Sequence, residues 1–287
     1  MTHVEVHDST RCILGEGALW HPDRQQFFWC DILSNRVLTR ENGMLRDWTF
    51  DTQVSCLGWV DYDRLIVATG RGLMLLDLPS GRSETLCDLE HDRAENRSND
   101  GRTDPFGGFW VGTMGIAKDE HGGAIYRYYM GELRRVIAGL SIPNAICFDP
   151  DGTTAYFSDT PEQTIRRLRL DTDGWPVDEA DIAVDLRGTD HVADGAICDA
   201  DGTIWTAQWG SGRVAAYDSR GKFAGAVDMP ARQVTCPALG GPDLTTLYCT
   251  SATIGLDEAE LAANAGHGRT FRLSGLPKGQ REHKVLL

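Results

Sequence analysis

A β-hairpin motif that recurs six times is the feature that most constrains the fold of this 287-residue chain. Its clearest copy covers residues 144–159, where an apolar run at 145–148 is followed by Asp-Pro-Asp-Gly at 149–152 and a second apolar run at 155–157. Asp, Pro and Gly are turn-forming residues, and Gly takes positive φ at little cost. The stretch therefore predicts a strand, a tight turn and a second strand.

The other copies become visible when this hairpin is compared along the chain with its turn as the anchor. The residue five places before each turn marks the start of a copy, and these residues are 40 to 50 positions apart. A repeat of this length with about four strand-like runs is typical of a β-propeller, in which each repeat forms one blade. We therefore predict an all-β fold, a six-bladed β-propeller with four antiparallel strands per blade. The six starting residues are Glu16, Cys56, Asn99, Asn144, Asp194 and Cys236.

The segments outside the hairpins predict how the ring closes. Residues 3–14 precede the first repeat and alternate at first as His-Val-Glu-Val-His, so we expect them to join the last blade as a closing strand. Six copies of one unit without a Ser/Pro-rich linker predict one domain over residues 1–287. A short helix is expected at 257–263. The loop at 115–123 is a candidate lid or rim over the channel mouth, and a plain solvated connection is the alternative.

The composition argues against several classes of partner. The formal charge is -14 and the pI is near 4.9, whereas nucleic-acid binding needs clustered Lys and Arg. No run approaches the ~18 to 20 apolar residues of a membrane span, and the first residues lack the features of a secretory signal. The eight cysteines include no C-x-x-C pair, which is typical of small buried side chains in a reducing cytosol. We therefore expect a cytoplasmic protein that binds neither nucleic acid nor membranes.

The six starting residues form a ring around the central channel if the innermost strand of each blade begins at the same point. Two of them, Cys56 and Cys236, are expected to fill the channel as small apolar groups. A ring of oxygen ligands without imidazole suits a hard divalent cation, Ca²⁺ before Mg²⁺ or Mn²⁺. The four ring positions with side-chain oxygens are Glu16, Asn99, Asn144 and Asp194.

Six short motifs carry a resemblance to a known family: Leu14-Gly-Glu-Gly-Ala-Leu-Trp20, Arg97-Ser-Asn-Asp-Gly101, Phe109-Trp-Val-Gly-Thr-Met114, Ile142-Pro-Asn-Ala145, Asp194-Gly-Ala196 and Gly240-Gly-Pro-Asp243. Through them the chain resembles the senescence marker protein/regucalcin/gluconolactonase family over nearly its whole length. The resemblance implies a six-bladed propeller with one divalent cation at the channel mouth, which hydrolyses sugar lactones. It also implies that Glu16, Asn144 and Asp194 bind the metal and that Arg97 and Asn99 contact the substrate.

The chain departs from the animal members of that family at one place. After Gly112-Thr-Met114 the animal members carry acidic residues that can touch the substrate, whereas this chain has Gly115-Ile-Ala117. The bacterial sugar lactonases are therefore the better comparison. We expect a monomer that acts on an aldono- or aldarolactone with one divalent cation, Ca²⁺ first, with Zn²⁺, Mn²⁺, Mg²⁺ and Fe²⁺ left open.

Lactone opening needs a polarised carbonyl, an activated water and a stabilised oxyanion. We expect Asp194 both to bind the metal and to take a proton from the attacking water. Asn99 could donate a hydrogen bond to a lactone oxygen, and Arg97 could bind sugar hydroxyls or a carboxylate. His121 and His191 lie in loops that could overhang the mouth, but we assign them no catalytic role.

Two other functions stay open at this point. A phosphotriesterase-like hydrolase of the diisopropylfluorophosphatase type would use a comparable calcium site, and an apolar pocket would favour it. A non-catalytic calcium-binding propeller would have its site filled by protein ligands beneath a flat apolar face, since many propellers are scaffolds. Arg97 and the polar loops favour the sugar lactonase.

Overall fold

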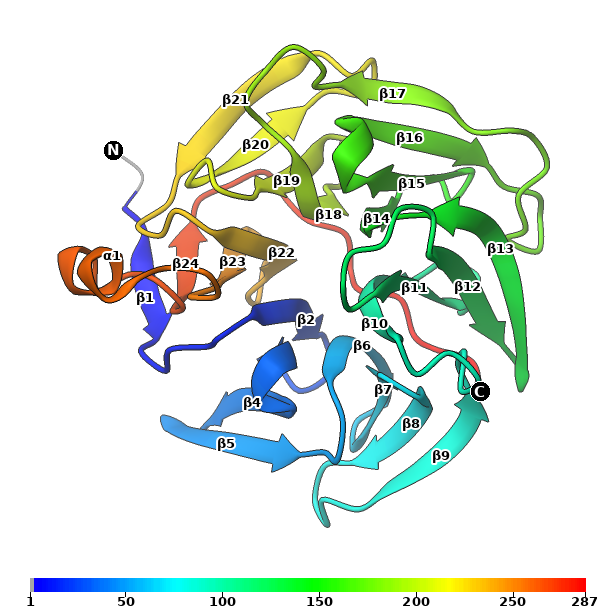
Figure 1. Ribbon diagram of the computed structural model, residues 1–287, viewed down its shortest axis with the longest axis horizontal. Coiled ribbons are helices and arrows are strands. Elements are labelled where there is room, and N and C mark those ends of the chain that lie inside the picture. The colour runs from blue at the N-terminus through cyan, green and yellow to red at the C-terminus, as the bar shows by residue number, and fades with distance from the viewer. Residues whose placement is uncertain (1–2) are drawn as a thin grey trace.

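The computed structural model, which describes residues 3–287, is a ring of six antiparallel four-stranded sheets (Figure 1). This arrangement confirms the predicted six-bladed propeller. The first hairpin strand of every blade lies innermost and contacts the innermost strands of both neighbouring blades. These six strands are β2 (Gly15–His21), β6 (Val54–Asp61), β10 (Asn96–Thr103), β14 (Pro143–Phe148), β18 (Ala193–Cys198) and β22 (Val234–Gly240).

Further strands complete each blade toward the outside. In blades 1 to 3 they are β3 (Gln26–Asp31), β4 (Arg36–Glu41) and β5 (Met44–Thr49), then β7 (Arg64–Thr69), β8 (Gly72–Asp77) and β9 (Ser83–Asp88), then β11 (Phe109–Gly115), β12 (Gly123–Tyr129) and β13 (Glu132–Leu140). In blades 4 to 6 they are β15 (Thr154–Asp159), β16 (Thr164–Arg169) and β17 (Asp181–Asp185), then β19 (Ile204–Gln208), β20 (Arg213–Tyr217) and β21 (Phe223–Asp228), then β23 (Thr246–Ser251) and β24 (Thr270–Ser274).

The ring is closed by β1 (Glu5–Asp8), which pairs antiparallel with β24 as the outermost strand of blade 6. Blade 6 thus combines one strand from the start of the chain with three from its end. This pairing confirms the predicted closure by the N-terminal strand, although the strand is shorter than the 3–14 segment. Closure joins the two ends of the sequence in one sheet, so the ring cannot open without breaking strand pairing.

Acidic side chains hold the turns between the first two strands of several blades. Asp149 Oδ1 accepts hydrogen bonds of 2.8 and 3.0 Å from the backbone N–H groups of Thr153 and Thr154. Asp199 Oδ1 accepts one of 2.9 Å from Thr203 at the equivalent turn. Asp at this position therefore stabilises the turn through its own side chain. This explains why Asp recurs at the same turn in successive blades.

Helical structure in the described residues is limited to α1 (Glu258–Ala263) and two short 3₁₀ turns, η1 (Ile32–Ser34) and η2 (Thr160–Glu162). The helix lies where it was predicted. It begins with a capping box, in which Asp257 accepts from the backbone N–H of Glu260 and the Glu260 carboxylate accepts from that of Asp257. None of the helices within residues 3–287 has the length and apolar character needed to cross a membrane.

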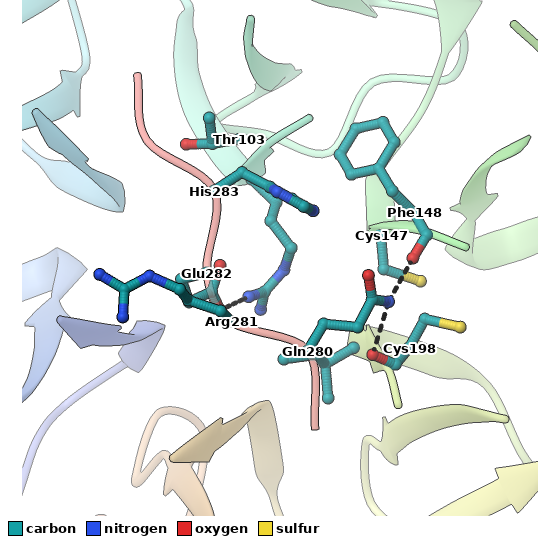
Figure 2. Close-up of a pocket in the computed structure, with 10 residues that line it drawn as sticks. Thr103, Cys147, Phe148, Cys198, Gln280, Arg281, Glu282 and His283 are labelled. Atoms are coloured by element: carbon teal, nitrogen blue, oxygen red, sulfur yellow. Dashed lines mark hydrogen bonds and ion pairs between the residues drawn. The ribbon is translucent and has the colours of Figure 1, made fainter. Parts of the chain in front are cut away.

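A channel floor, formed by residues 278–286, crosses one end of the central channel. In Figure 1 this red segment runs across the middle of the ring. Gln280 Nε2 donates hydrogen bonds of 3.0 Å to the carbonyl oxygens of Phe148 and Cys198, at the far ends of β14 and β18 (Figure 2). Arg102 and Glu282 form a buried ion pair beside them. The channel is therefore accessible for ligands from its other end, where the innermost strands begin.

Candidate active site

Each innermost strand carries a β-bulge near its start. In β2 the register with β3 shifts between Glu16 and Leu19, and in β14 the register with β15 shifts between Asn144 and Cys147. Equivalent shifts occur in β6, β10, β18 and β22. A bulge bends the strand and redirects the side chains next to it. The repeated ring position of the sequence is thus the position of the bulge.

Two of the bulges contain left-handed backbone directly after a predicted metal ligand. The φ angle is 59° at Gly17 and 56° at Ala145. Gly adopts this conformation freely, whereas an L-residue with a Cβ loses roughly 1–2 kcal/mol there. Ala145 directly follows Asn144 and keeps this unfavourable backbone conformation, so the surrounding structure must impose it. The same constraint fixes the direction of the Asn144 side chain.

Two buried aspartates fix the segments that lead into β2 and β14. Asp31 Oδ1 accepts a 3.0 Å hydrogen bond from the backbone N–H of Leu14, and Asp159 Oδ1 accepts one of 2.8 Å from Ile142. The second carboxylate oxygen of each aspartate accepts a hydrogen bond from the backbone N–H one residue earlier, that of Ile13 or Ser141. Hydrogen bonds from backbone N–H to a carboxylate are stronger than neutral ones, so these clamps set the start of both strands.

The bulges bring the predicted site residues into one pocket of about 230 Å³ at the channel mouth. All five predicted residues line it: Glu16, Arg97, Asn99, Asn144 and Asp194. The rest of the lining, to which the sequence assigned no role of its own, is Leu14, Met114, Lys118, Ile142, Thr160, Trp209 and Ile254. A signal for two of them was present, because an apolar residue stands two places before the ring position in blades 1 and 4.

A chain of hydrogen bonds connects the site residues across blades 3, 4 and 5. Arg97 Nη1 donates to Asn99 Oδ1 at 2.9 Å, and Asn99 Nδ2 donates to Asn144 Oδ1 at 2.9 Å. Asn144 Nδ2 donates to Thr160 Oγ1 at 2.9 Å, and the Thr160 hydroxyl donates to the carbonyl oxygen of Ala193 at 3.1 Å. The chain ends next to Asp194, so the orientations of these side chains are interdependent.

Asn99 is engaged more fully than the sequence suggested. Its amide nitrogen donates to Asn144 Oδ1 and also, at 3.1 Å, to the carbonyl oxygen of Pro143. A hydrogen bond from Asn99 to a lactone oxygen would require one of these to break. Arg97 Nε and Nη2, by contrast, have no hydrogen-bonding partner within residues 3–287. The geometry therefore leaves the donors of Arg97 available to a ligand and uses Asn99 to position its neighbours.

Three buried acids concentrate negative charge in the site. Glu16, Asp100 and Asp194 are 6%, 4% and 6% exposed. Burial raises the pKa of Glu16 and the charges of Asp194 and Asp100 raise it further; burial and then Asp100 also raise the pKa of Asp194. Arg97 is the cation that opposes these shifts, and neither Glu16 nor Asp194 forms a salt bridge in the described part of the chain. Arg102, which acts on Asp100, is already paired with Glu282, so Arg97 does not neutralise the three carboxylates and the site favours a bound cation.

The donor set fits a hard divalent metal. No group of three or more His, Cys, Asp or Glu side chains placed to hold a metal occurs within residues 3–287, so a third protein donor beside Glu16 and Asp194 would be an amide. Asn144 Oδ1 accepts from Asn99 and retains a second lone pair. Two carboxylates and a carboxamide oxygen are ligands of the kind that Ca²⁺ and similar cations bind. Bound here, a cation would offset the unneutralised charge of Glu16 and Asp194.

The other residues considered from the sequence lie elsewhere. His121 Nδ1 is 2.9 Å from a backbone carbonyl of β13, and His191 Nδ1 is 2.9 Å from Ser211 Oγ, so both rings bond outside the pocket lining. Cys56 and Cys236 are 0% and 2% exposed and belong to apolar clusters. The two thiols fill space at the ring positions that carry no oxygen, as the sequence predicted.

Comparison with known proteins decides the family. The model of the SMP-30/Gluconolactonase/LRE-like region matches residues 14–253. The chain belongs to this family. The match confirms the resemblance carried by the sequence motifs, and the matched region contains every predicted site residue.

Relatives within and around the family are similar along nearly their whole length. The chain is 35% identical over 253 residues to a 6-deoxy-6-sulfogluconolactonase from Pseudomonas putida, covering 87% of each protein. It is 33% identical over 294 residues to a pentonolactonase from Haloferax volcanii, covering 99% of this chain and 98% of the relative. Among solved structures, a calcium-binding protein, regucalcin, from Agrobacterium tumefaciens has a TM-score of 0.97 and 37% identity, covering 100% of this chain and 98% of the other.

Proposed function

We propose that this protein is a divalent-metal-dependent lactonase that hydrolyses aldono- or aldarolactones to open-chain sugar acids. The observation that carries the proposal is the pocket in which Glu16, Asn144 and Asp194 lie together with Arg97 at the channel mouth. Family membership and the lactonase names of the relatives support it.

Glu16, Asn144 and Asp194 would hold the metal. Their hard oxygen donors favour Ca²⁺, and the structural relative from A. tumefaciens is described as calcium-binding. When bound, a divalent cation supplies Lewis-acid polarisation of the lactone carbonyl and lowers the pKa of water.

The protein side chains supply positioning and proton transfer. Asp194 accepts a proton from the water that adds to the lactone carbonyl carbon. The ring C–O bond then breaks, and the released ring oxygen takes up that proton as a hydroxyl group. The ionised form of Asp194 is favoured once a cation neutralises the buried charge. Arg97 binds a substrate oxygen through Nε and Nη2, while Asn99 holds the guanidinium in place.

The test is proton release, followed with a pH indicator, on a panel of aldono- and aldarolactones. Metal-stripped protein is compared with protein refilled with Ca²⁺, Mg²⁺, Mn²⁺, Zn²⁺ or Fe²⁺. We expect metal-restored turnover that Asp194→Asn reduces at least about 100-fold, since general-base catalysis contributes on that scale. Asp190→Asn, an exposed aspartate nearby in sequence, is the matched control. Lactone opening no faster than the spontaneous rate with every metal would overturn the proposal.

A phosphotriesterase-like activity is a second candidate, because part of the pocket wall is apolar. The apolar lining residues are Leu14, Met114, Ile142, Trp209 and Ile254. Such a wall accommodates an organophosphate as well as the carbon face of a sugar ring. Fluoride release from diisopropylfluorophosphate in the same metal series separates the two functions. Faster turnover of this compound than of any lactone would put the phosphotriesterase first, and absence of both activities would leave a binding propeller.

A further inference from the structure

One lysine lies at the pocket, in a chain that uses almost no lysine. Of the 28 Lys and Arg residues, the lysines are Lys118, Lys222, Lys278 and Lys284. Lys118 alone among them lines the pocket, from the 115–123 loop between β11 and β12. The sequence predicts a lid, a rim or a plain connection for this loop and assigns no role to its side chains.

The loop is tied down at both ends, which fixes the place of Lys118. The backbone N–H of Ile116 donates to the carbonyl oxygen of Glu95 at 2.8 Å. Near the other end, Asn96 Nδ2 donates to the carbonyl oxygen of Gly122 at 3.0 Å. Glu95 directly precedes β10 and Asn96 begins it, and β10 is the strand that carries Arg97 and Asn99. The loop therefore forms a rim of the pocket and presents Lys118 on the same blade as Arg97.

The charge balance of the pocket leaves Lys118 in excess. Glu16 and Asp194 in the pocket wall and Asp100 next to Asn99 contribute three buried carboxylates when ionised. Arg102, which also acts on Asp100, is paired with Glu282 and adds no net charge. Arg97 and a divalent cation, on which the proposed function depends, contribute three positive charges that balance the three carboxylates. Lys118 forms no salt bridge within residues 3–287, and its side chain is exposed at the mouth. A loaded site would thus offer one unpaired positive charge to the part of the substrate nearest the rim.

We propose that Lys118 is a specificity-determining residue that selects lactones with an anionic substituent, a carboxylate or a sulfonate, remote from the lactone carbonyl. The inference rests on the proposed lactonase function. In the proposed function the lactone carbonyl lies near Asp194 and Arg97, at the bulges of the innermost strands. The opposite end of the substrate therefore faces the rim. There the ammonium group of Lys118 pairs with an anionic substituent, whereas a neutral hydroxymethyl group gains no such attraction.

A matched pair of substrates tests this inference. D-Glucono-1,4-lactone and D-glucaro-1,4-lactone differ only in a hydroxymethyl group against a carboxylate. We expect kcat/KM to be about tenfold higher for the anionic lactone, which corresponds to a modest attraction. Lys118→Met should remove most of that preference by lowering kcat/KM for the anionic lactone more than for the neutral one. Lys222→Met is the control for loss of an exposed lysine. The preference should also fall with added salt, because exposed charges are screened.

Further measurements compare a sulfonate with a carboxylate as the anionic substituent. They also distinguish failure of the role of Lys118 from failure of the lactonase function. A 6-sulfo-gluconolactone tells whether a sulfonate serves as well as a carboxylate. Equal kcat/KM for the matched pair, or an unchanged ratio in Lys118→Met, overturns the role of Lys118 while the lactonase function stands. If neither lactone is opened, the lactonase function fails, and calorimetric binding of glucarolactone to the metal-loaded protein decides the rest. Weaker binding to Lys118→Met would then support recognition of the anion, and equal binding would overturn it.

Discussion

At the residue scale, Asp159 fixes the start of β14, the strand that carries Asn144, without lining the pocket itself. Its carboxylate accepts hydrogen bonds of 2.9 and 2.8 Å from the backbone N–H groups of Ser141 and Ile142. Asp159→Asn leaves one of these N–H groups facing an NH₂ group. We expect a loss of about 2 kcal/mol in the free energy of unfolding, since a buried donor loses its partner. We also expect about tenfold weaker Ca²⁺ binding, because the start of β14 shifts.

Urea unfolding and calcium titration measure the two effects. Asp178→Asn, an exposed aspartate in an ion pair with Arg169, controls for loss of a surface charge and should change neither quantity appreciably. Unchanged calcium affinity in Asp159→Asn would show that the clamp does not position Asn144.

The repeat explains which of these residues a sequence can reveal. Glu16 and Asn144 stand at the same place in two copies of the hairpin, and Asp31 and Asp159 follow them at one common offset, so both pairs are visible by alignment of the chain with itself. Lys118 lies in a loop without counterparts in the other blades. Its place at the pocket depends on the hydrogen bonds of that loop, which no periodicity reports.

At the element scale, the bulge of β2 depends on a glycine. Gly17 has a φ of 59°, and a Cβ there would lie 2.5 Å from the carbonyl oxygen of Ser55 on β6. We expect Gly17→Ala to lower the free energy of unfolding by about 2 kcal/mol or more, from backbone strain and from the clash together. Metal affinity should fall as well, because Glu16 lies directly before the bulge. Thermal unfolding with and without calcium measures both.

Blade 4 supplies the matched control for this prediction. Ala145 occupies the same bulge position with a φ of 56°. Ala145→Gly relieves roughly 1–2 kcal/mol of strain but loses a buried methyl group and gains chain entropy on unfolding, so we expect a net change within about 1 kcal/mol. Equal stability of Gly17→Ala and the unsubstituted protein would show that the bulge tolerates a side chain.

The strands and turns of the blades follow from the alternation and turn chemistry of the sequence, but the bulges do not. A bulge changes the register between two strands, and the same residues alternate whether or not it is present. The sequence did not predict the channel floor either. Gln280 bonds to the ends of β14 and β18, which are distant in the chain, and the segment has no repeat to identify it.

At the scale of the whole molecule, the two ends of the chain close different parts of the propeller. β1 completes blade 6 from outside, and the C-terminal residues form the channel floor (Figure 1). His7 of β1 lies edge-on to Phe27, Trp29 and Tyr248, with ring centroids 5.5, 6.1 and 5.1 Å away. Its Nε2 is buried without a hydrogen-bonding partner. The closing strand thus places an ionisable ring in apolar surroundings between blades 1 and 6.

Protonation of His7 should therefore weaken the closure of the ring. Burial, helped by the charge of Arg272, lowers the pKa of His7 to about 4 from an ordinary value of 6.5. Between these values the unfolded chain binds more protons than the folded one, so the stabilising contribution is complete above pH 6.5 and is lost as the pH falls toward 4. The loss amounts to about 3 kcal/mol in the free energy of unfolding.

Urea unfolding of metal-free protein from pH 7.5 to 4.5 measures this loss. The His7→Gln variant should lack this part of the pH dependence. His91→Gln, at an exposed position, should keep it, and a slope shared by all three proteins would assign the acid sensitivity to other groups.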